Sequence, residues 1–348
     1  MPNRSASRSA LSALLLLGLA CRSAVPPSRP SAARSATRSA ASPVELPSRY
    51  EEGRWYVAPV TTEGETLLFY TDSGGGTNLL FAPVAERLKL PREPVEMDGQ
   101  KGEVTAFPAM RPGASIPLPS PESPLGSKLL VVPYEGEVRR MAPPDVSGFP
   151  RSTGFLGQWW LADKVWTFDY PGRHLLLRSP GDLPAVAPEH RVPLGFQTGP
   201  DGRRTSQFAR LQAEISGEVL DFLFDTGATT FLTDAALKAL NDGRPSERAA
   251  SFVTASSFLR WHREHPDWRV IEEAEKGSNE AMIEVPVVRI GGYTVGPVWF
   301  TRRPDRNFHV YMFQWMDKPV EGALGGSALQ SLRVTIDYPH AVAVFEKP

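Results

Sequence analysis

The chain has 348 residues, of which 41% are hydrophobic and 22% charged, as in a soluble globular protein long enough for two domains or two similar lobes. Its formal net charge of −1 gives no indication of nucleic-acid binding, and a single cysteine excludes an intramolecular disulfide and a zinc site built on several cysteines. The 34 prolines and 29 glycines favour a β-rich protein with many turns.

The first 21 residues are typical of a bacterial export signal. Arg4 and Arg8 precede an apolar run from Ala10 to Ala20, which is too short to span a bilayer. Small residues end the run, and Leu17-Gly18-Leu19-Ala20-Cys21 resembles a lipoprotein signal in which Cys21 becomes the lipidated first residue. We therefore expect an exported protein of the cell envelope, periplasmic or anchored to the outer membrane through Cys21. Plain secretory cleavage is the alternative.

Residues 22–48 are rich in Ser, Ala, Arg and Pro and contain few large apolar side chains. Such a segment buries too little surface to fold, so it is expected to be a disordered linker, with folded structure beginning near Arg49. We expect an N-terminal lobe at 49–182 and a C-terminal lobe at 183–348.

Most of the later chain consists of short β-branched and aromatic runs between turn residues, which predict strands. Two stretches are expected to be helical. The first is short, from Ala235 to Leu240. The second runs from Ala249 to about Lys276, is interrupted by Pro266, and has no counterpart of similar composition in the first half. The strands are expected at 55–60, 66–71, 128–132, 165–170, 219–224, 281–290, 295–301 and 334–338.

An internal repeat decides the expected fold. With Asp72 placed on Asp225, the motif Asp-Ser-Gly falls on Asp-Thr-Gly, and the match extends without a gap from Gly64 on Gly217 to Ala82 on Ala235. With Gly157 placed on Gly325, a late Leu-Gly motif and the strand after it also match without a gap, as far as Pro171 on Pro339. Each half thus has an early aspartate motif and a late Leu-Gly motif in the same order.

The repeated aspartate motif has a chemical consequence. In each half an apolar strand leads into the aspartate, the glycine permits a tight loop, and the hydroxyl residue can bond to the opposite loop. Two-fold packing of the halves would bring Asp72 and Asp225 together. Two carboxylates roughly 3 Å apart share one proton, so one can act as a base toward water while the other polarises a carbonyl.

With these motifs the chain resembles the aspartic peptidases of the pepsin and retropepsin type, over about residues 55–345. The resemblance implies an all-β, bilobal acid-protease fold, with a small helical insertion in the second lobe. It implies endopeptidase activity on an extended peptide, without cofactor or metal, by one chain acting as a monomer. By position, Asp72 and Asp225 would be catalytic, and the supporting loop residues would be Ser73, Gly74, Thr226, Gly227, Gly157 and Gly325.

The sequence departs from that family at the two loops and at the flap. Gly75 and Ala228 stand where pepsin-like sequences usually have a hydroxyl residue, which predicts a less acidic working pH because a hydroxyl stabilises the ionised carboxylate. The segments 97–107 and 275–284 are the candidate flaps, and neither has an obvious flap tyrosine.

Other candidate sites are interpreted as structural. His262 and His265 lack the His-Glu-x-x-His pattern of zinc peptidases, and Ser327 lacks the glycine that a nucleophile elbow requires two residues later. The repeated Asp169 and Asp337 each precede Tyr-Pro and are expected to form turns. Trp159 and Trp160 fit either a core or a wall of the substrate site.

The sequence is also consistent with two alternatives to a monomeric peptidase. The fold can serve as a non-catalytic module that binds peptides or another protein of the cell surface, which the glycine-rich first loop and the unclear flap favour. Alternatively, each lobe can pair with a lobe of a second chain.

Overall fold

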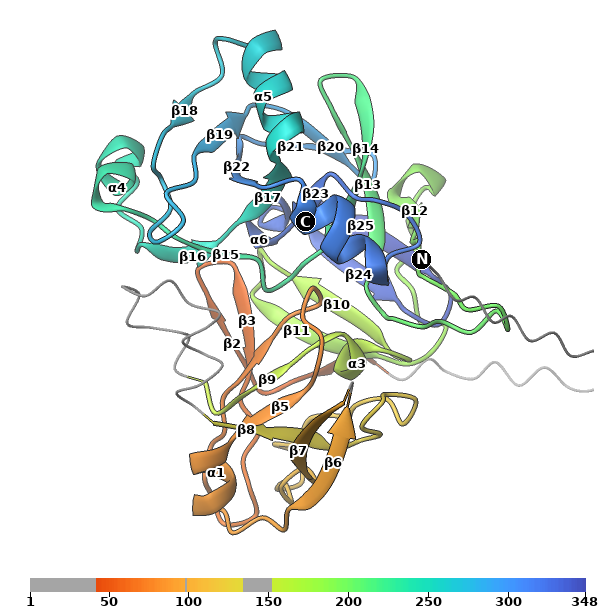
Figure 1. Cartoon of the computed structure of the whole chain (residues 1–348). Helices are drawn as coiled ribbons and strands as arrows, with labels where there is room; N and C mark the ends of the chain where they lie inside the picture. The colour runs from red at the N-terminus through yellow and green to blue at the C-terminus, as the bar shows by residue number, and fades with distance from the viewer. Residues whose placement is uncertain (1–41, 98, 134–151) are drawn as a thin grey trace, which may run out of the picture. The chain divides into compact units, whose positions relative to one another are not determined.

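The computed structural model describes residues 42–97, 99–133 and 152–348 (Figure 1). The expected export signal and Cys21 lie outside the described residues. The expected linker lies largely outside them as well, but its last part does not. Strand β1 (Val44–Glu45) pairs with β11 (His174–Arg178), and the side chain of Leu46 is buried. Folded structure therefore begins before Arg49, where the sequence analysis placed its start.

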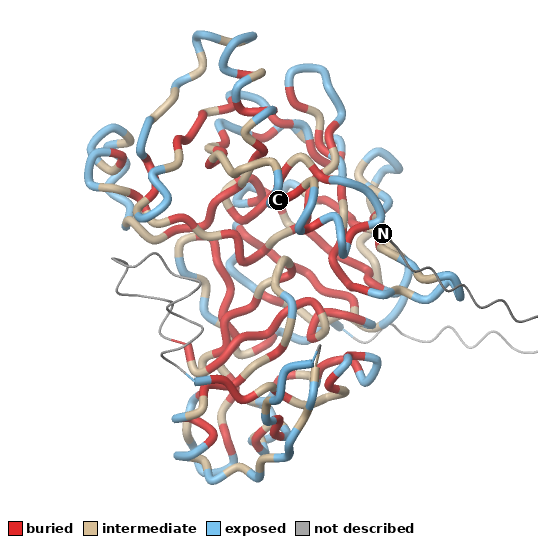
Figure 2. Tube along the Cα trace, in the orientation of Figure 1, coloured by how far each residue is buried: buried red, intermediate tan, exposed pale blue. Residues whose placement is uncertain are grey.

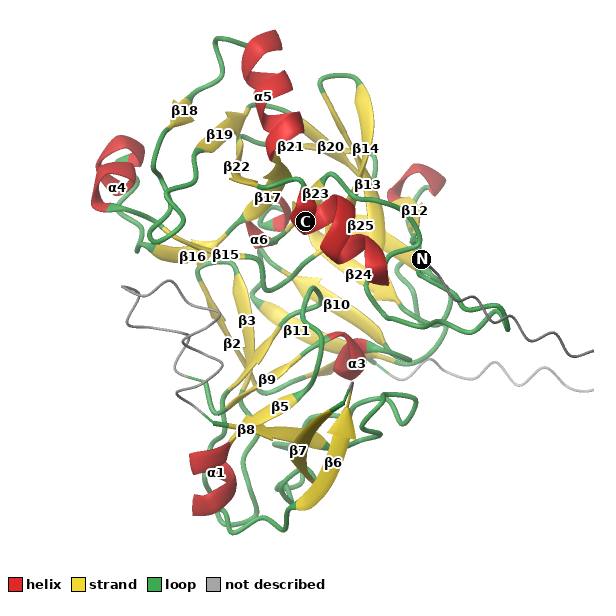
Figure 3. Cartoon of the chain, viewed as in Figure 1, coloured by secondary structure: helices red, strands yellow, loops and turns green. Residues whose placement is uncertain are grey.

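The regular secondary structure of the described chain is mostly strand, with a few short helices (Figure 3), so the expected all-β, bilobal class is confirmed. Lobe 1 is built on an eight-stranded sheet with the order β2-β3-β4-β9-β5-β8-β7-β6. The bounds of its strands are β2 Ser48–Glu51, β3 Arg54–Val57, β4 Phe69–Thr71, β5 Leu79–Phe81, β6 Glu93–Met97, β7 Gln100–Thr105, β8 Leu129–Val132 and β9 Gly154–Leu156.

Lobe 2 is built on a nine-stranded sheet with the order β18-β19-β22-β17-β23-β14-β13-β20-β21, and a separate pair β15-β16. The bounds of its strands are β13 Arg210–Ile215, β14 Glu218–Phe224, β15 Thr229–Phe231, β16 Glu247–Ala249, β17 Ser251–Thr254, β18 Val270–Ile271, β19 Met282–Val285, β20 Val288–Ile290, β21 Tyr293–Val295, β22 Val298–Arg303 and β23 Gly322–Leu324.

A six-stranded sheet, β1-β11-β10-β24-β25-β12, joins the two halves, because β10 (Val165–Asp169) of the first half pairs antiparallel with β24 (Arg333–Asp337) of the second. Its remaining strands are β12 (Arg191–Pro193) and β25 (Val342–Glu346). The core runs through this sheet into both lobes (Figure 2), and the ring of Phe168 on β10 lies 5.8 Å from that of Phe224, next to Asp225.

The helical segments are short. They are α1 Ala82–Arg87, α3 Gln158–Leu161, η1 Pro188–His190, α4 Asp234–Leu240, α5 Ala255–Glu264, η2 Asn307–Tyr311, η3 Met312–Trp315 and α6 Gly326–Leu329. Helix α4 confirms the short helix expected after the second motif, and Thr233 caps it by accepting a hydrogen bond from the Ala236 N–H. The helix expected from Ala249 to about Lys276 is mostly wrong, because only α5 is helical there and residues 251–254 and 270–271 are strands. Helix α5 ends just before Pro266, where the sequence predicted a break.

The two lobes repeat one topology. Strand β4 runs parallel to β9, and β14 runs parallel to β23. Strand β5 lies between β9 (antiparallel) and β8 (parallel), and β17 lies in the same way between β23 and β22. Helix α1 follows β5 as α5 follows β17. The 249–276 stretch therefore contains a counterpart of α1, and the small helical insertion of lobe 2 is instead β15-α4-β16.

Two predicted strands are each two strands in the structure. The 281–290 stretch is divided by Pro286 into β19 and β20, and the 295–301 stretch is divided at Gly296-Pro297 between β21 and β22. A proline has no N–H for the ladder, so the interruptions fall where the chemistry requires them. The other predicted strands are present with boundaries shifted by a few residues.

Candidate active site

Corresponding backbone contacts hold the two aspartate loops. Strands β4 and β14 end one residue before Asp72 and Asp225. The Asp72 N–H donates to the Leu156 carbonyl at 3.0 Å, and the Asp225 N–H donates to the Leu324 carbonyl at 3.0 Å. The late Leu-Gly motif of each half thus fixes the backbone under the aspartate of the same half.

Gly157 and Gly325 follow those leucines, and a side chain fits at neither position. A Cβ on Gly157 would lie 2.6 Å from the Gly75 carbonyl oxygen, and one on Gly325 would lie 2.1 Å from the Ala250 carbonyl oxygen. Both glycines are therefore required for close approach of backbone to the aspartate loops.

A side chain in each lobe also holds these glycines, and the sequence analysis missed both. The Gly157 N–H donates to Asn78 Oδ1 at 2.9 Å, and the Gly325 N–H donates to Ser251 Oγ at 3.2 Å. Asn78 immediately precedes β5 and Ser251 begins β17, so they occupy equivalent places. The gapless match gave no signal for this pair, because it placed Asn78 opposite Phe231.

The hydroxyl residues of the two loops bond across the lobe boundary. Ser73 Oγ donates to the Phe224 carbonyl at 2.7 Å and accepts from the Thr226 N–H at 2.9 Å. In the other direction, the Ser73 N–H donates to Thr226 Oγ1 at 3.1 Å. Both side chains are fully buried. The loops are therefore fixed to each other by reciprocal hydrogen bonds.

The carboxyl groups of Asp72 and Asp225 lie together, each against the glycine of the opposite loop. A Cβ on Gly74 would lie 2.6 Å from Asp225 Cγ, and a Cβ on Gly227 would lie 2.2 Å from Asp72 Cγ. Each carboxylate also accepts an N–H from its own loop, Gly74 to Asp72 Oδ1 at 2.7 Å and Gly227 to Asp225 Oδ1 at 3.1 Å. The structure thus brings together both aspartates and the four predicted residues of their loops, Ser73, Gly74, Thr226 and Gly227. Gly157 and Gly325 pack against the same loops.

The environment of the pair raises both pKa values. Burial raises the pKa of Asp72, while a hydrogen bond with Asp225 and backbone N–H groups act in the opposite direction. Burial, then the charge of Asp72 and the hydrogen bond with it, raise the pKa of Asp225 well above that of an ordinary aspartate. The two groups are coupled, so they titrate as a pair that shares one proton.

The candidate flap segments differ from each other. The first contains the turn and second strand of the β6–β7 hairpin, whose first strand, Glu93–Met97, lies largely before the expected segment. In the second, Glu275 is buried and accepts hydrogen bonds from Thr230 at 3.0 Å and from Arg303 at 2.6 and 2.7 Å. That segment is anchored to its own lobe by a buried ion pair.

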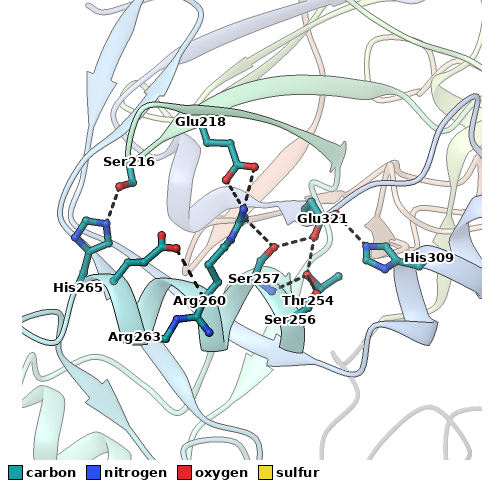
Figure 4. A network of polar contacts seen from close by, with 11 residues as sticks. Ser216, Glu218, Thr254, Ser256, Ser257, Arg260, Arg263, His265, His309 and Glu321 are labelled. Carbon is teal, nitrogen blue, oxygen red and sulfur yellow. Dashed lines mark hydrogen bonds and ion pairs between the residues drawn. The ribbon is translucent and has the colours of Figure 1, made fainter.

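The two histidines interpreted as structural lie on α5 or directly after it, and His262 is exposed there. His265 stacks on Trp268 and bonds to Ser216 Oγ at 2.6 Å, at one end of the polar network along α5 drawn in Figure 4. Among the described residues no group of three or more His, Cys, Asp or Glu is placed to hold a metal ion.

The other repeated or candidate residues also lie in structural positions. Ser327 Oγ lies 2.9 Å from Ser251 Oγ. Asp169 pairs with Arg333 at 2.8 Å, and Asp337 bonds to His340 at 2.8 Å. Trp160 is in the core, where its Nε1–H donates to the Pro117 carbonyl at 2.8 Å, and Trp159 is half-buried.

Comparison with known proteins finds a likeness to solved structures. No protein-family model matches the chain, and no curated protein matches it. Among solved structures the chain is similar to the crystal structure of the aspartic proteinase from Irpex lacteus, at 9% sequence identity and a TM-score of 0.46, covering 88% of this chain and 97% of that one. In the described part of the chain, no helix is long and apolar enough to cross a membrane.

Proposed function

We propose that this protein is an aspartic endopeptidase that hydrolyses peptide bonds with a water molecule activated by Asp72 and Asp225. The observation that supports this most directly is the reciprocal packing of the two loops, in which each motif glycine lies against the carboxyl group of the other motif. A structural turn after a strand would not require two carboxyl groups to be buried against each other, because that arrangement destabilises the ionised protein.

The chemistry follows from one shared proton. The ionised member of the Asp72–Asp225 pair accepts a proton from water as the water oxygen attacks the peptide carbonyl carbon, and the protonated member donates its proton to the carbonyl oxygen. The tetrahedral intermediate then collapses as the C–N bond breaks, with a proton passing to the leaving nitrogen. The pair returns to its singly protonated form, and no covalent enzyme intermediate is formed. An extended substrate would be held by strand-like main-chain hydrogen bonds.

The test is digestion of a mixed peptide library by the purified protein from acid to neutral pH, with the products identified by mass spectrometry. Cleavage at defined bonds is the expected result, and the most susceptible peptide also defines the specificity. A folded protein that leaves the library intact at every pH would contradict the proposal.

A second candidate function is a non-catalytic peptide-binding module. The feature that favours it is the first flap hairpin, since its strands β6 and β7 contain no tyrosine. Under this hypothesis the library peptides would bind without being cut, and Asp225→Asn would leave binding unchanged.

Export and lipidation at Cys21 are proposed from the sequence alone. Expression of the full chain in a bacterium, followed by membrane fractionation, tests them. The unmodified protein is expected in the membrane fraction, and Cys21→Ser in the soluble one. Equal distribution of the two would contradict lipid anchoring.

A further inference from the structure

One side chain beside the aspartate loops has a partner in the opposite lobe that the repeat does not account for. Tyr70 lies on β4, two residues before Asp72, and its side chain is buried, with 4% of its surface exposed. Its hydroxyl lies 2.6 Å from the Gly227 carbonyl oxygen and 2.9 Å from Thr229 Oγ1. Because alternate residues of a strand share a face, Tyr70 and Asp72 extend toward the same side of lobe 1.

The hydrogen-bond roles are fixed by what each atom can do. The Gly227 carbonyl only accepts, so the Tyr70 hydroxyl donates to it. Thr229 Oγ1 lies 2.9 Å from the same carbonyl oxygen and can also give its proton to the Tyr70 oxygen. Burial raises the pKa of Tyr70 well above that of free tyrosine, so the donor proton is retained across the working pH range.

The ring of Tyr70 is held as firmly as its hydroxyl. It packs between Tyr56 and Phe155, with ring centroids at 5.1 and 6.0 Å. Phe155 also lies under the first loop, since a Cβ on Gly75 would meet its ring at 2.1 Å. The hydroxyl therefore projects from a fixed support in lobe 1 to the backbone of the second loop.

No residue of lobe 2 makes an equivalent hydrogen bond to the first aspartate loop among the described residues. In the repeat, Tyr70 corresponds to Leu223 and Thr229 corresponds to Gly76, so the first loop receives no matching hydroxyl. Gly227 donates its N–H to Asp225 Oδ1 and packs against the Asp72 carboxyl group, so it connects the tyrosine to both aspartates.

We infer that Tyr70 is a positioning residue for the Asp72–Asp225 pair, acting through the Gly227 backbone; the inference rests on the proposed function for its catalytic consequence. By fixing the Gly227 carbonyl, Tyr70 holds the neighbouring N–H on Asp225 Oδ1. That N–H bond favours the ionised carboxylate. Loss of the tyrosine hydroxyl loosens the bond, which moves the titration of the pair to higher pH.

The test compares Tyr70→Phe with a matched control, Tyr56→Phe. Both changes remove one hydroxyl from a buried ring of the same cluster, and no hydrogen bond of the Tyr56 hydroxyl is found among the described residues. Tyr70→Phe is expected to lower kcat by about tenfold with KM changed less than about twofold, and to move the pH–rate profile to higher pH. Tyr56→Phe is expected to leave kcat and the profile unchanged.

A second readout does not require turnover. The carboxyl carbon of Asp225, observed by NMR in the protein labelled with ¹³C-aspartate and assigned with Asp225→Asn, should titrate at higher pH in Tyr70→Phe than in the unmodified protein. An unchanged titration midpoint would overturn the inference, as would a loss of activity that follows thermal stability with no change of the pH profile. If the unmodified protein cleaves nothing, the proposed function fails, and the carboxyl titration still decides the role of Tyr70.

Discussion

Strands β10 and β24 are neighbours in the middle of the six-stranded sheet, and the hydroxyl oxygens of Thr167 and Thr335 lie 2.7 Å apart between them. These threonines are also matched residues in the sequence repeat, and they are direct partners in the strand register. The local two-fold axis that relates the halves therefore passes between them. The reciprocal bonds of Ser73 and Thr226 obey the same relationship, so one axis relates the shared sheet and the two aspartate loops.

The serine of the first loop is expected to be important for stability as well as for geometry. Ser73→Ala leaves the buried Phe224 carbonyl and Thr226 N–H without the Ser73 hydroxyl, which should cost about 2–3 kcal/mol of unfolding free energy. Ser73→Thr copies Thr226 and should retain most of the stability. Denaturant titration measures both, and equal stability of Ser73→Ala and the unmodified protein would contradict the interlobe bonds.

Space, rather than backbone strain, makes two glycines of the loops essential. None of Gly74, Gly76 and Gly227 has a positive φ, so alanine is compatible with each backbone. Gly227→Ala and Gly74→Ala nevertheless place a Cβ against the opposite carboxyl group and should reduce kcat by roughly a hundredfold. Gly76→Ala is the control, because nothing lies within 4 Å of its added Cβ. Similar kcat values for all three variants would exclude the close packing.

The raised pKa of Asp225 predicts how stability changes with pH. A carboxyl group whose pKa is higher in the folded than in the unfolded protein contributes stability at low pH, and that contribution is lost as pH rises through the folded pKa. Asp225→Asn carries no such charge, so its Tm should exceed that of the unmodified protein at neutral and alkaline pH, with the difference shrinking toward acid pH. Calorimetry across pH checks this, and a constant Tm difference would contradict the shifted pKa.

The free energy of unfolding should be unusually sensitive to loss of the acidic partner in one ion pair between the lobes. Arg54, on β3 of lobe 1, is 3% exposed and pairs with Glu247 on β16 of lobe 2. Glu247→Gln leaves a buried guanidinium without its counter-charge and should cost about 3 kcal/mol. The control is Glu52→Gln at the more exposed Arg244–Glu52 pair, 2.9 Å apart, which joins the turn between β2 and β3 to the segment before β16; there the cost should be below about 1 kcal/mol. Equal costs in denaturant titration would contradict the burial of Arg54.

The sequence was sufficient for the β-rich class, the repeat and the residues of the two loops, because a glycine or hydroxyl in an aspartate loop is specified by its immediate neighbours. It failed where lobe 2 contains additional chain. Residues of β15, α4 and β16 follow the second loop and look like β5 and α1 in sequence, yet β17 takes the place of β5 beside the Leu-Gly strand. Pairing between strands decides which strand lies beside the Leu-Gly strand, and a gapless sequence match gives no information on that pairing.

The asymmetric contacts between the lobes were also beyond the sequence. Tyr70 and Thr229 belong to different halves and correspond to residues without a hydroxyl, so the repeat gave no reason to join them. Arg54 and Glu247 are 193 positions apart in the chain and have no repeated partners. Asymmetric contacts of this kind depend on how the halves pack, which is decided by the whole core rather than by any motif.

The most direct test of the central claim is the rate of hydrolysis of one susceptible peptide by the unmodified protein, Asp72→Asn and Asp225→Asn, each shown to be folded. If the two carboxyl groups act as one shared acid and base, both variants should lose activity by at least about a thousandfold at every pH. Retention of activity by either variant would show that the pair does not carry the reaction.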